Sequence, residues 1–345
     1  PDAAASPSPA GRAESGAREQ LRLLQALPRP LLQRLGRGGR PDAQGAVGHN
    51  KGRWLGAQYQ RGAGLYFLYA AAISDRAAGE DAWRAFDLAF SHEDTGGAFG
   101  FTNRSGTPGA ARDACSDAAF FLAQFDQAAL VARVSPLADT FRARVDASLP
   151  RVRAAGSFVQ GCRSLLLARD EHATNRLFVD GLALALTGLL AGDGALVMAG
   201  QSLIDGALRS QRADGTFDEA GGEDTSYHNV AILMMQVYAL YAGPSPALDE
   251  ALAKAVRWAL PHVGDAGEID VAGNSRTGSG QETYFGQAKD VNYGESALAL
   301  AYFGLAHSDP GALAAGERAF AFRYGDKAKP ESRRGDAGEG PEQAE

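Results

Sequence analysis

The chain has 345 residues, of which 45% are hydrophobic and 22% charged, and its formal net charge is −7. These are ordinary values for a globular protein that is large enough to bury a substantial core. The negative charge argues against nucleic acid or an anionic membrane as partner, because both need a broad basic surface. It leaves room for a local cationic cleft that binds an acidic polymer. Since no run approaches the roughly 18 apolar residues of a membrane span, we expect no membrane insertion.

The two ends of the chain differ in composition from its middle. Residues 1–18 are rich in Ala, Pro, Ser and Gly, and residues 326–345 are charged and nearly free of large apolar groups. Such compositions predict a disordered N-terminal stub and a disordered C-terminal tail around one domain, 19–325. Because the chain starts at Pro1 rather than Met, and its first residues resemble a stub left by processing, we expect a secreted or periplasmic protein.

Cys115 and Cys162 are the two cysteines. In an oxidising compartment they could form one disulfide. Two buried free thiols are the alternative, and their separation fits no metal motif.

The middle of the chain has a helical period and predicts an all-α fold. Leu182, Leu186, Leu189 and Leu190 follow the i, i+4, i+7, i+8 spacing of one helix face. A helix end, a short Asp/Ser/Pro turn and a new helix start recur, which is typical of helical hairpins. The recurring turns lie in Ala71–Trp83, Leu189–Leu196, Leu240–Leu248 and Gly304–Leu313.

Long Gly-rich loops separate these hairpins, at 92–112, 212–228 and 262–292. Short turns on one side and long loops on the other predict an (α/α) toroid, or incomplete barrel, of about six helical hairpins. Its loops would surround one mouth, where function usually lies. An open helical solenoid is the alternative architecture.

Two polar segments stand out, His172–Arg176 and Ala213–Asn229. Each precedes an apolar helix, so its side chains are expected at a helix N-terminus, where donors and the helix dipole favour anions. Thr225 or Ser226 is expected to cap the second helix. In the alternative interpretation, Tyr227, His228 and Asn229 only cap and wedge that helix.

The order of motifs from Asn175 to Leu240 resembles toroid-type polysaccharide lyases. The alginate lyases have an Asn at a helix start, an Asp/Gly turn with Phe and a Tyr-His-Asn, matched here by Asn175, Asp214-Gly215 with Phe217, and Tyr227-His228-Asn229. Asn175-Arg176 and Asp214-Gly215-Thr216-Phe217 are similar to the chondroitin and hyaluronan lyase version. The resemblance covers about 65 residues closely.

The resemblance implies β-elimination next to a uronate, as in alginate or polyglucuronate. This reaction removes a weakly acidic proton alpha to a carboxylate, so the carboxylate charge must be neutralised. The implied roles are neutralisation for Asn175 and acid, or acid and base, for Tyr227. Neither family's His position is kept, since Arg176 follows Asn175 and Glu219 lies past the Phe. His228 is therefore the first candidate base and His172 the second.

Other polar residues are candidates for binding an acidic polysaccharide. Arg176 and Asn229 flank the catalytic candidates, and Arg276 could bind a carboxylate with two hydrogen bonds. The segment 273–296 could form a second wall of the site, and the aromatic and cationic residues of 49–62 suit stacking on sugars. The remaining binding candidates are Arg53, Trp54, Tyr59, Asn274, Gln281, Glu282, Tyr284, Asn292 and Tyr293.

Two other functions remain open from the sequence. A glycoside hydrolase could use the carboxylates of Asp218, Glu219, Glu223 and Asp224 as acid and base. A non-catalytic glycan-binding protein is the other, favoured by the missing family histidine. No pair of histidines has the spacing of a helical metal site, so no catalytic metal and no cofactor is expected.

Overall fold

The computed structural model describes residues 8–102, 109–243, 245–278 and 282–325. These residues contain thirteen α-helices, three short 3₁₀ helices and one two-stranded antiparallel hairpin. The elements are α1 (Pro9–Ala26), α2 (Arg29–Gly38), η1 (Gly48–Asn50), η2 (Ala57–Gln60), α3 (Gly62–Ile73), α4 (Arg76–Ser91), α5 (Ala111–Val134), α6 (Ala138–Gly161), α7 (Arg163–Asp170), α8 (Thr174–Ala191), α9 (Gly194–Arg209), α10 (Thr225–Ala242), α11 (Pro246–Ala259), η3 (Leu260–His262), β1 (Thr283–Tyr284), β2 (Gln287–Ala288), α12 (Tyr293–His307) and α13 (Pro310–Tyr324).

The predicted helical hairpins are confirmed at all four recurring turns, which join α3 to α4, α8 to α9, α10 to α11 and α12 to α13. Ser74 leaves α3 in the left-handed conformation, with φ 60°, and Asp75 then caps α4 by accepting the Ala78 N–H. Ser308 and Asp309 repeat this arrangement between α12 and α13. A chain reversal followed at once by an N-cap lets two helices pack side by side with little connecting chain.

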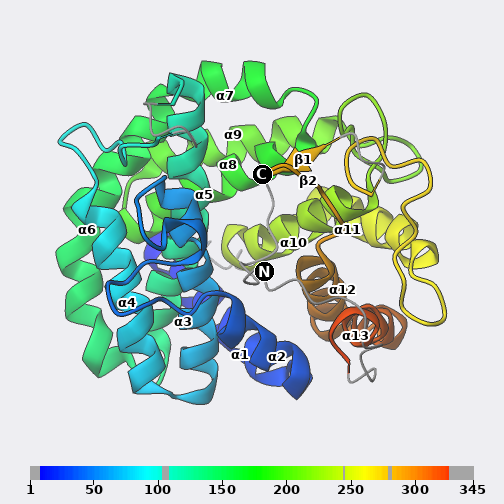
Figure 1. Ribbon diagram of the computed structural model, residues 1–345, viewed down its shortest axis with the longest axis horizontal. Helices are drawn as coiled ribbons and strands as arrows, with labels where there is room; N and C mark the ends of the chain where they lie inside the picture. Colours follow the sequence, from blue (N-terminus) through cyan, green and yellow to red (C-terminus); the bar gives the residue numbers. More distant parts are fainter. Residues whose placement is uncertain (1–7, 103–108, 244, 279–281, 326–345) are drawn as a thin grey trace, which may run out of the picture.

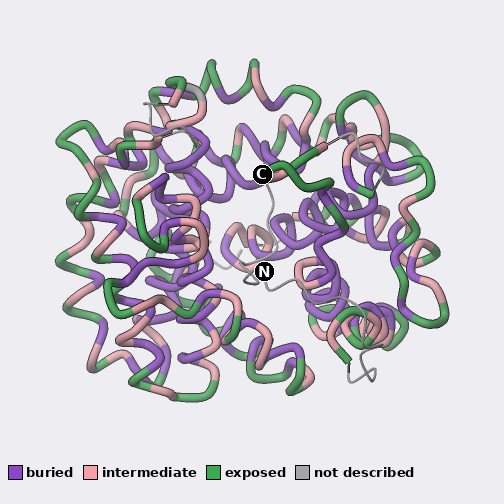
Figure 2. Tube along the Cα trace, viewed as in Figure 1, coloured by how far each residue is buried: buried purple, intermediate pink, exposed green. Residues whose placement is uncertain are grey.

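The paired helices lie in two layers. α5, α8, α10 and α12 contact one another in succession, and α9 and α13 pack against α8 and α12 from outside. Nearly every residue of α8 is buried, as Figure 2 shows for the inner helices. The all-α prediction is confirmed in this coarse form, whereas the closing of the hairpins into a toroid stays a prediction. Within the described ranges, no helix is long and apolar enough to cross a membrane.

The first helix corrects the predicted N-terminal stub. Residues 9–18, assigned to disorder from their composition, form the first half of α1, and Ala13, Gly16 and Ala17 are buried. A Cβ added at Gly16 would lie 2.6 Å from the Leu240 carbonyl oxygen and from the Tyr241 ring. Small side chains let α1 approach α10 closely. The Ala- and Gly-rich composition from which disorder was predicted is therefore the composition that this helix contact requires. Residues 1–7 and the predicted tail 326–345 lie outside the described part of the chain.

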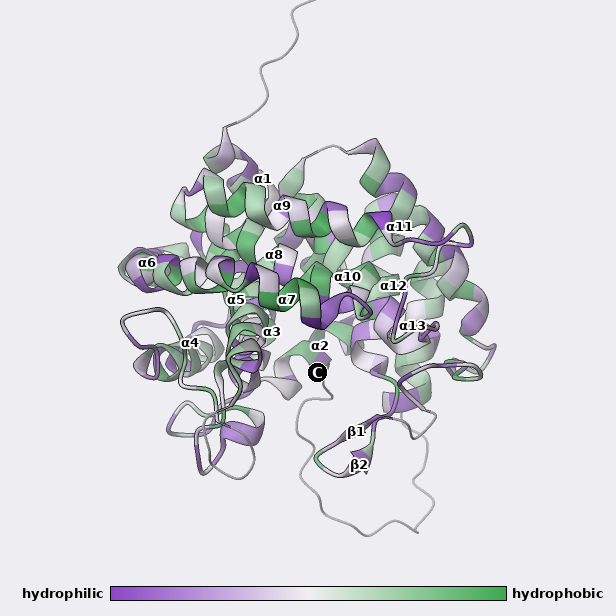
Figure 3. Ribbon diagram, turned by 90° about the horizontal axis from the view of Figure 1, so that it is seen from above, coloured by the Kyte–Doolittle hydropathy of each residue, from purple (hydrophilic) through white to green (hydrophobic). Residues whose placement is uncertain are grey.

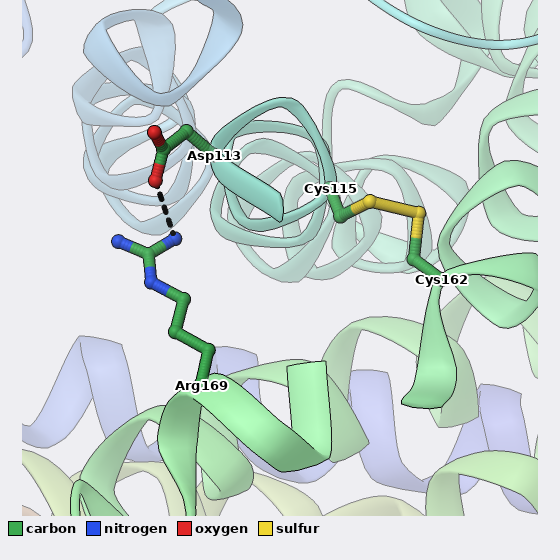
Figure 4. Close-up of a disulfide and its surroundings, with 4 residues drawn as sticks. All are labelled: Asp113, Cys115, Cys162 and Arg169. Carbon is green, nitrogen blue, oxygen red and sulfur yellow. Dashed lines mark ion pairs between the residues drawn. A yellow bond between two sulfur atoms is a disulfide. The ribbon is translucent and has the colours of Figure 1, made fainter. Parts of the chain in front are cut away.

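Cys115 and Cys162 form a disulfide with a Cα–Cα distance of 6.0 Å, so the bonded alternative is the correct one. It joins the second turn of α5 to the residue that follows α6 (Figure 4). Close by, Arg169 of α7 pairs with Asp113 of α5 at 3.3 Å. Both links fasten the segment that leads into α8 to the inner helix α5.

Long loops precede α10 and α12, as predicted. Residues 263–292 form the longer one, which carries the hairpin of β1 and β2. Figure 3 shows this hairpin projecting from one side of the helical body. The loops bring residues from distant parts of the sequence to the N-termini of α8 and α10.

Candidate functional site

The N-terminus of α10 is held by Asp224. The carboxylate of Asp224 accepts the Tyr227 N–H at 3.0 Å and is therefore the N-cap in place of the expected Thr225 or Ser226. It also accepts the backbone N–H groups of Arg276 at 3.1 Å and Thr277 at 2.7 Å. One buried carboxylate thus fixes the 263–292 loop to the first turn of α10 and places Arg276 beside Tyr227.

Arg276 lies at the centre of the densest polar contacts. Its Nη1 donates to Glu219 at 2.7 Å and to Asn175 Oδ1 at 3.4 Å. Its Nε donates to Glu282 at 3.0 Å, and its guanidinium carbon lies 3.8 Å from the centroid of the Tyr227 ring. We call Asn175, Glu219, Tyr227, Arg276 and Glu282 the Arg276 cluster. Burial opposes the charge of Arg276, but Tyr227 and the two carboxylates raise the pKa of its guanidinium.

Tyr227 supplies a neutral hydroxyl to this cluster. The side chain is buried, and its hydroxyl donates to Glu282 Oε2 at 3.1 Å. Burial raises the pKa of Tyr227 well above its ordinary value, although Arg276 opposes the shift. The phenol therefore keeps its proton at neutral pH, where its hydroxyl is a hydrogen-bond donor.

Glu219 connects the two helix starts. It is fully buried, and its Oε1 accepts the Asn175 N–H at 2.9 Å while its Oε2 pairs with Arg276. Burial raises the pKa of Glu219 to about 7, with Arg276 acting against the shift. Glu219 thus holds Arg276 most firmly above neutral pH, when the carboxyl is ionised.

Asn175 leaves one donor unused. Its side chain is 0% exposed, and its Nδ2 has no hydrogen-bond partner among the described residues. A buried amide donor without an acceptor is costly, so such a group marks a place where a ligand oxygen can bind. Because Asn175 Oδ1 faces Arg276, the free donor lies at the Arg276 cluster.

Behind this cluster lies a buried carboxyl pair that sequence reasoning missed. Asp170 lies 3.9 Å from the Nε of Arg176, and Asp180 follows Arg176 by one helical turn. Burial raises the pKa of both carboxyls, and that of Asp180 is raised further by Asp170. The i, i+4 spacing of Arg176 and Asp180 was the available signal, but the position of Asp170 depends on the fold.

The structure does not bring His228 to Tyr227. The His228 ring is buried on the other side of α10, where Nε2 lies 3.0 Å from the Ala255 carbonyl oxygen and the ring packs against Trp258. Successive helix residues point about 100° apart, so a helix that turns Tyr227 toward Arg276 turns His228 toward α11. Burial lowers the pKa of His228 to about 4, and the neutral ring belongs to the helix interface.

His172, the second candidate base, points into solvent. Its side chain is 70% exposed, and Nδ1 lies 2.8 Å from Asp218. The hydrogen bond with Asp218 raises the pKa of His172. Arg212 also contacts Asp218, at 3.1 Å, so His172 belongs to a surface ion-pair group outside the Arg276 cluster.

Three other predicted binding residues serve local structure, and a fourth, Asn229, is buried. Asn274 accepts a backbone N–H at the start of α10, and Asn292 caps α12. The Tyr293 hydroxyl accepts a backbone N–H at 3.1 Å. Asn229 is buried in α10, and its Oδ1 has no partner in the described part of the chain.

The predicted aromatic and cationic segment divides into two groups. Arg53 is exposed, and Trp54 donates to the Phe99 carbonyl oxygen at 3.0 Å and stacks on His92. Tyr59 lies elsewhere, next to the hairpin of β1 and β2. Gln281 lies outside the described residues.

His49 lies in a cluster of aromatic rings and was not among the residues predicted from the sequence. Its ring stacks on Phe285 at 3.8 Å and lies 5.4 Å from the Tyr284 ring, with Tyr59 at 5.6 Å. Lys289 lies 6.0 Å from the Tyr284 centroid and 4.8 Å from that of Tyr227. The hairpin therefore links His49 to the Arg276 cluster.

An open pocket lies next to these residues, between α2, α3, α12 and α13. Leucines from α2 and α3 line it, and Tyr59 and Arg61 contribute polar groups. The Arg61 guanidinium lies 5.3 Å from the Phe120 ring, and that of Arg176 lies 6.0 Å from the same ring. The Phe120 ring thus lies near both Arg61 of the pocket and Arg176 in the first turn of α8.

Comparison with known proteins adds little to this geometry. No protein family matches the sequence, and no curated protein matches it. One solved structure with a similar arrangement is ent-copalyl diphosphate synthase from Streptomyces platensis, with a TM-score of 0.42 and 16% identity over 75% of this chain and 45% of that one. The chain thus spans less than half the length of that protein, and a likeness at this level carries no argument about activity.

Proposed function

We propose that the protein is a polysaccharide lyase that cleaves a uronate-containing polymer, of the alginate or polyglucuronate class, by β-elimination. The observation that carries the proposal is the grouping of Arg276, the Asn175 amide and the neutral Tyr227 hydroxyl at two adjoining helix N-termini. The proposed scaffold is an incomplete toroid of helical hairpins with this group at its mouth.

The proposed roles follow from the charges that develop. Removing the proton alpha to a uronate carboxylate builds negative charge on that carboxylate, so Arg276 and the free Asn175 donor would stabilise it. The bond to the leaving glycosidic oxygen then breaks, and that oxygen needs a proton. Tyr227 holds one, because burial raises its pKa.

The proton acceptor needs a different assignment from the one made on sequence. His228 is buried against α11 and His172 faces solvent. We assign the role to His49, which lies against the hairpin that also carries Tyr284. For this role the proton on the carbon next to the bound carboxylate has to lie within hydrogen-bonding reach of the His49 ring.

The hydrolase alternative is less favoured by the same contacts. Asp224 is used in capping α10 and in holding the loop of Arg276, and Glu219 is fully buried between Arg276 and Asn175. Asp218 pairs with His172 and Arg212. Three of the four carboxylates considered for hydrolysis, all but Glu223, are therefore engaged in structural contacts rather than placed on two sides of a sugar, as hydrolysis requires.

The test is incubation with alginate, polyglucuronate, hyaluronan and chondroitin while absorbance in the low ultraviolet is followed. The expected result is a rise with one or more of these polymers, since elimination creates an unsaturated uronate that absorbs there. New reducing ends without the absorbance would overturn the lyase proposal in favour of hydrolysis. Binding without either change would indicate a glycan-binding protein.

We also propose that the protein functions in the periplasm or outside the cell. The Cys115–Cys162 disulfide supports this proposal, because such bonds persist in oxidising compartments.

A further inference from the structure

The carboxylate of Glu282 is held by three cationic or hydroxyl side chains. Arg276 donates to it through Nε at 3.0 Å and through Nη2 at 3.3 Å, in the two-pronged geometry that guanidinium groups use for carboxylates. The Tyr227 hydroxyl donates at 3.1 Å, and Lys289 Nζ lies at 3.4 Å. This arrangement is a complete recognition site for one carboxylate.

Glu282 is the outermost member of this arrangement. Its side chain is 21% exposed, against 11% for Arg276 and 6% for Lys289, and Tyr227 is 1% exposed. The donors therefore lie behind the carboxylate as seen from solvent. Moving the Glu282 side chain outward would expose their donor groups without unpacking the helices.

Two cationic and two acidic side chains, including Glu282 itself, meet at this place. Arg276 and Lys289 carry two positive charges, and Glu219 and Glu282 carry two negative ones when ionised. Glu219 is fully buried and cannot leave, whereas Glu282 lies at the surface. Removing Glu282 alone takes away one negative charge beside Arg276 and Lys289, and another carboxylate would replace it.

A second observation points to a ligand at the same place. The buried Nδ2 of Asn175 lacks an acceptor, while the Oδ1 of the same amide faces Arg276. Glu282 does not satisfy this donor. A carboxylate that is not tied to the loop could bind Arg276 and also reach this donor with one oxygen.

We propose that Arg276 and Lys289 form a carboxylate-binding site in which Glu282 occupies the place of the substrate's uronate group, and that the Tyr227 hydroxyl, which donates to Glu282 in the empty site, is released to the leaving oxygen when substrate binds. A uronate binds by exchanging its carboxylate for that of Glu282, so total charge is conserved and the Asn175 donor gains an acceptor. The uronate as ligand rests on the proposed function, but the carboxylate specificity rests on the contacts of Glu282 alone.

The exchange predicts that Glu282 competes with ligand. Glu282→Ala is expected to bind D-glucuronate at least about 10-fold more tightly than the natural protein, measured by isothermal titration calorimetry, because no internal carboxylate has to be displaced. D-glucose, which lacks the carboxylate, is expected to bind neither protein. Glu250→Ala, which removes an exposed glutamate paired with Lys254, is the matched control and should leave glucuronate affinity unchanged.

A second measurement keeps the test independent of sugar recognition. In Glu282→Ala, acetate should fill the empty carboxylate place and raise the melting temperature, with no comparable rise in the natural protein or in Glu282→Ala/Arg276→Gln. If Glu282→Ala binds glucuronate no more tightly, or if acetate does not stabilise it, the carboxylate-exchange proposal is wrong.

These outcomes separate the two proposals. Tighter glucuronate binding without ultraviolet absorbance on any polymer would keep the carboxylate site and reject the lyase. Lyase activity with unchanged or weakened glucuronate binding in Glu282→Ala would keep the lyase and reject the exchange. Circular dichroism and a cooperative melt establish that each variant is folded.

Discussion

Tyr227 and His228 are neighbours in the chain but belong to different regions of the molecule. On the Tyr227 side, α10 faces charged and amide groups drawn from α8 and two long loops. On the His228 side, it faces the Ala255 carbonyl oxygen and the rings of Phe217 and Trp258. Both side chains are buried, so burial alone does not distinguish a reactive group from a structural one. The neighbouring groups distinguish them, because the Tyr227 side of α10 faces charged and amide groups and the His228 side faces mainly aromatic rings.

The largest expected effect lies on the Tyr227 side. Tyr227→Phe removes the proposed proton donor while keeping the ring under Arg276, and kcat on the uronate polymer should fall about 10³-fold, within the range for general acids. The rate of ultraviolet absorbance increase measures this. Tyr238→Phe, on the same helix, is the control and should change kcat less than about 3-fold. A Tyr227→Phe variant with near-natural kcat would remove Tyr227 from the chemistry.

His228 should affect stability instead. Its pKa is lowered from 6.5 to about 4, so the neutral form is favoured in the folded protein. The stability that this contributes is present above pH 6.5 and is lost as pH falls through 4, by up to about 3 kcal/mol. In urea unfolding experiments, the free energy of unfolding of His228→Gln should fall less between pH 6.5 and pH 4 than that of the natural protein. Its kcat at neutral pH should stay within about 3-fold of the natural value.

His262→Gln is the matched control, since His262 also packs against Trp258. The His262→Gln variant should lose stability at acid pH to the same extent as the natural protein. A large loss of kcat in His228→Gln, with stability unchanged, would reverse the assignment of the two sides of α10.

Asn175 and Asn229 sharpen the comparison with one residue type. Both are buried amides with an unused polar atom, but Asn175 belongs to the Arg276 cluster and Asn229 to α10. Asn175→Ala should lower kcat/KM about 10²-fold, the size of one lost donor to a developing anion. Asn229→Ala should lower it less than about 5-fold. Equal effects of the two variants on kcat/KM would show that Asn175 has no special role.

The smallest expected effect concerns Glu219. Since its pKa is about 7, ionisation above that pH strengthens its pair with Arg276, and kcat/KM should rise as pH increases through 7. Glu219→Gln cannot ionise, so it should lose this rise and have a kcat/KM about 10-fold lower at pH 8. The pH profiles of both proteins test this. A rise that persists in Glu219→Gln would belong to another group.

Much of the fold follows from local sequence. The helical hairpins are marked by turn and cap residues, such as Ser74 with Asp75 and Ser308 with Asp309, whose effect depends only on nearby backbone. The first half of α1 could not be predicted in this way, because its small residues are explained only by the nearness of α10. The composition of a segment shows which side chains it can bury, but it does not show which other segment it packs against.

The site was only partly predictable for the same reason. Asn175 and Tyr227 lie in a motif, and Arg276 and Glu282 lie in one polar loop, so each could be named from the sequence. The buried position of Glu219, the contact of Asp170 with Arg176 and the approach of His49 to the hairpin depend on contacts between distant segments. The orientation of His228 was accessible in principle, since helical geometry separates it from Tyr227.

The disulfide acts mainly on the chain before it folds. Cys115 and Cys162 are 47 residues apart, and closing a loop of this size lowers the conformational entropy of the unfolded chain by an amount worth about 4 kcal/mol. The loop contains nearly all of α5 and all of α6, so an unfolded molecule keeps these two segments within reach of each other. The bond therefore favours the native state by reducing the freedom that unfolding would regain.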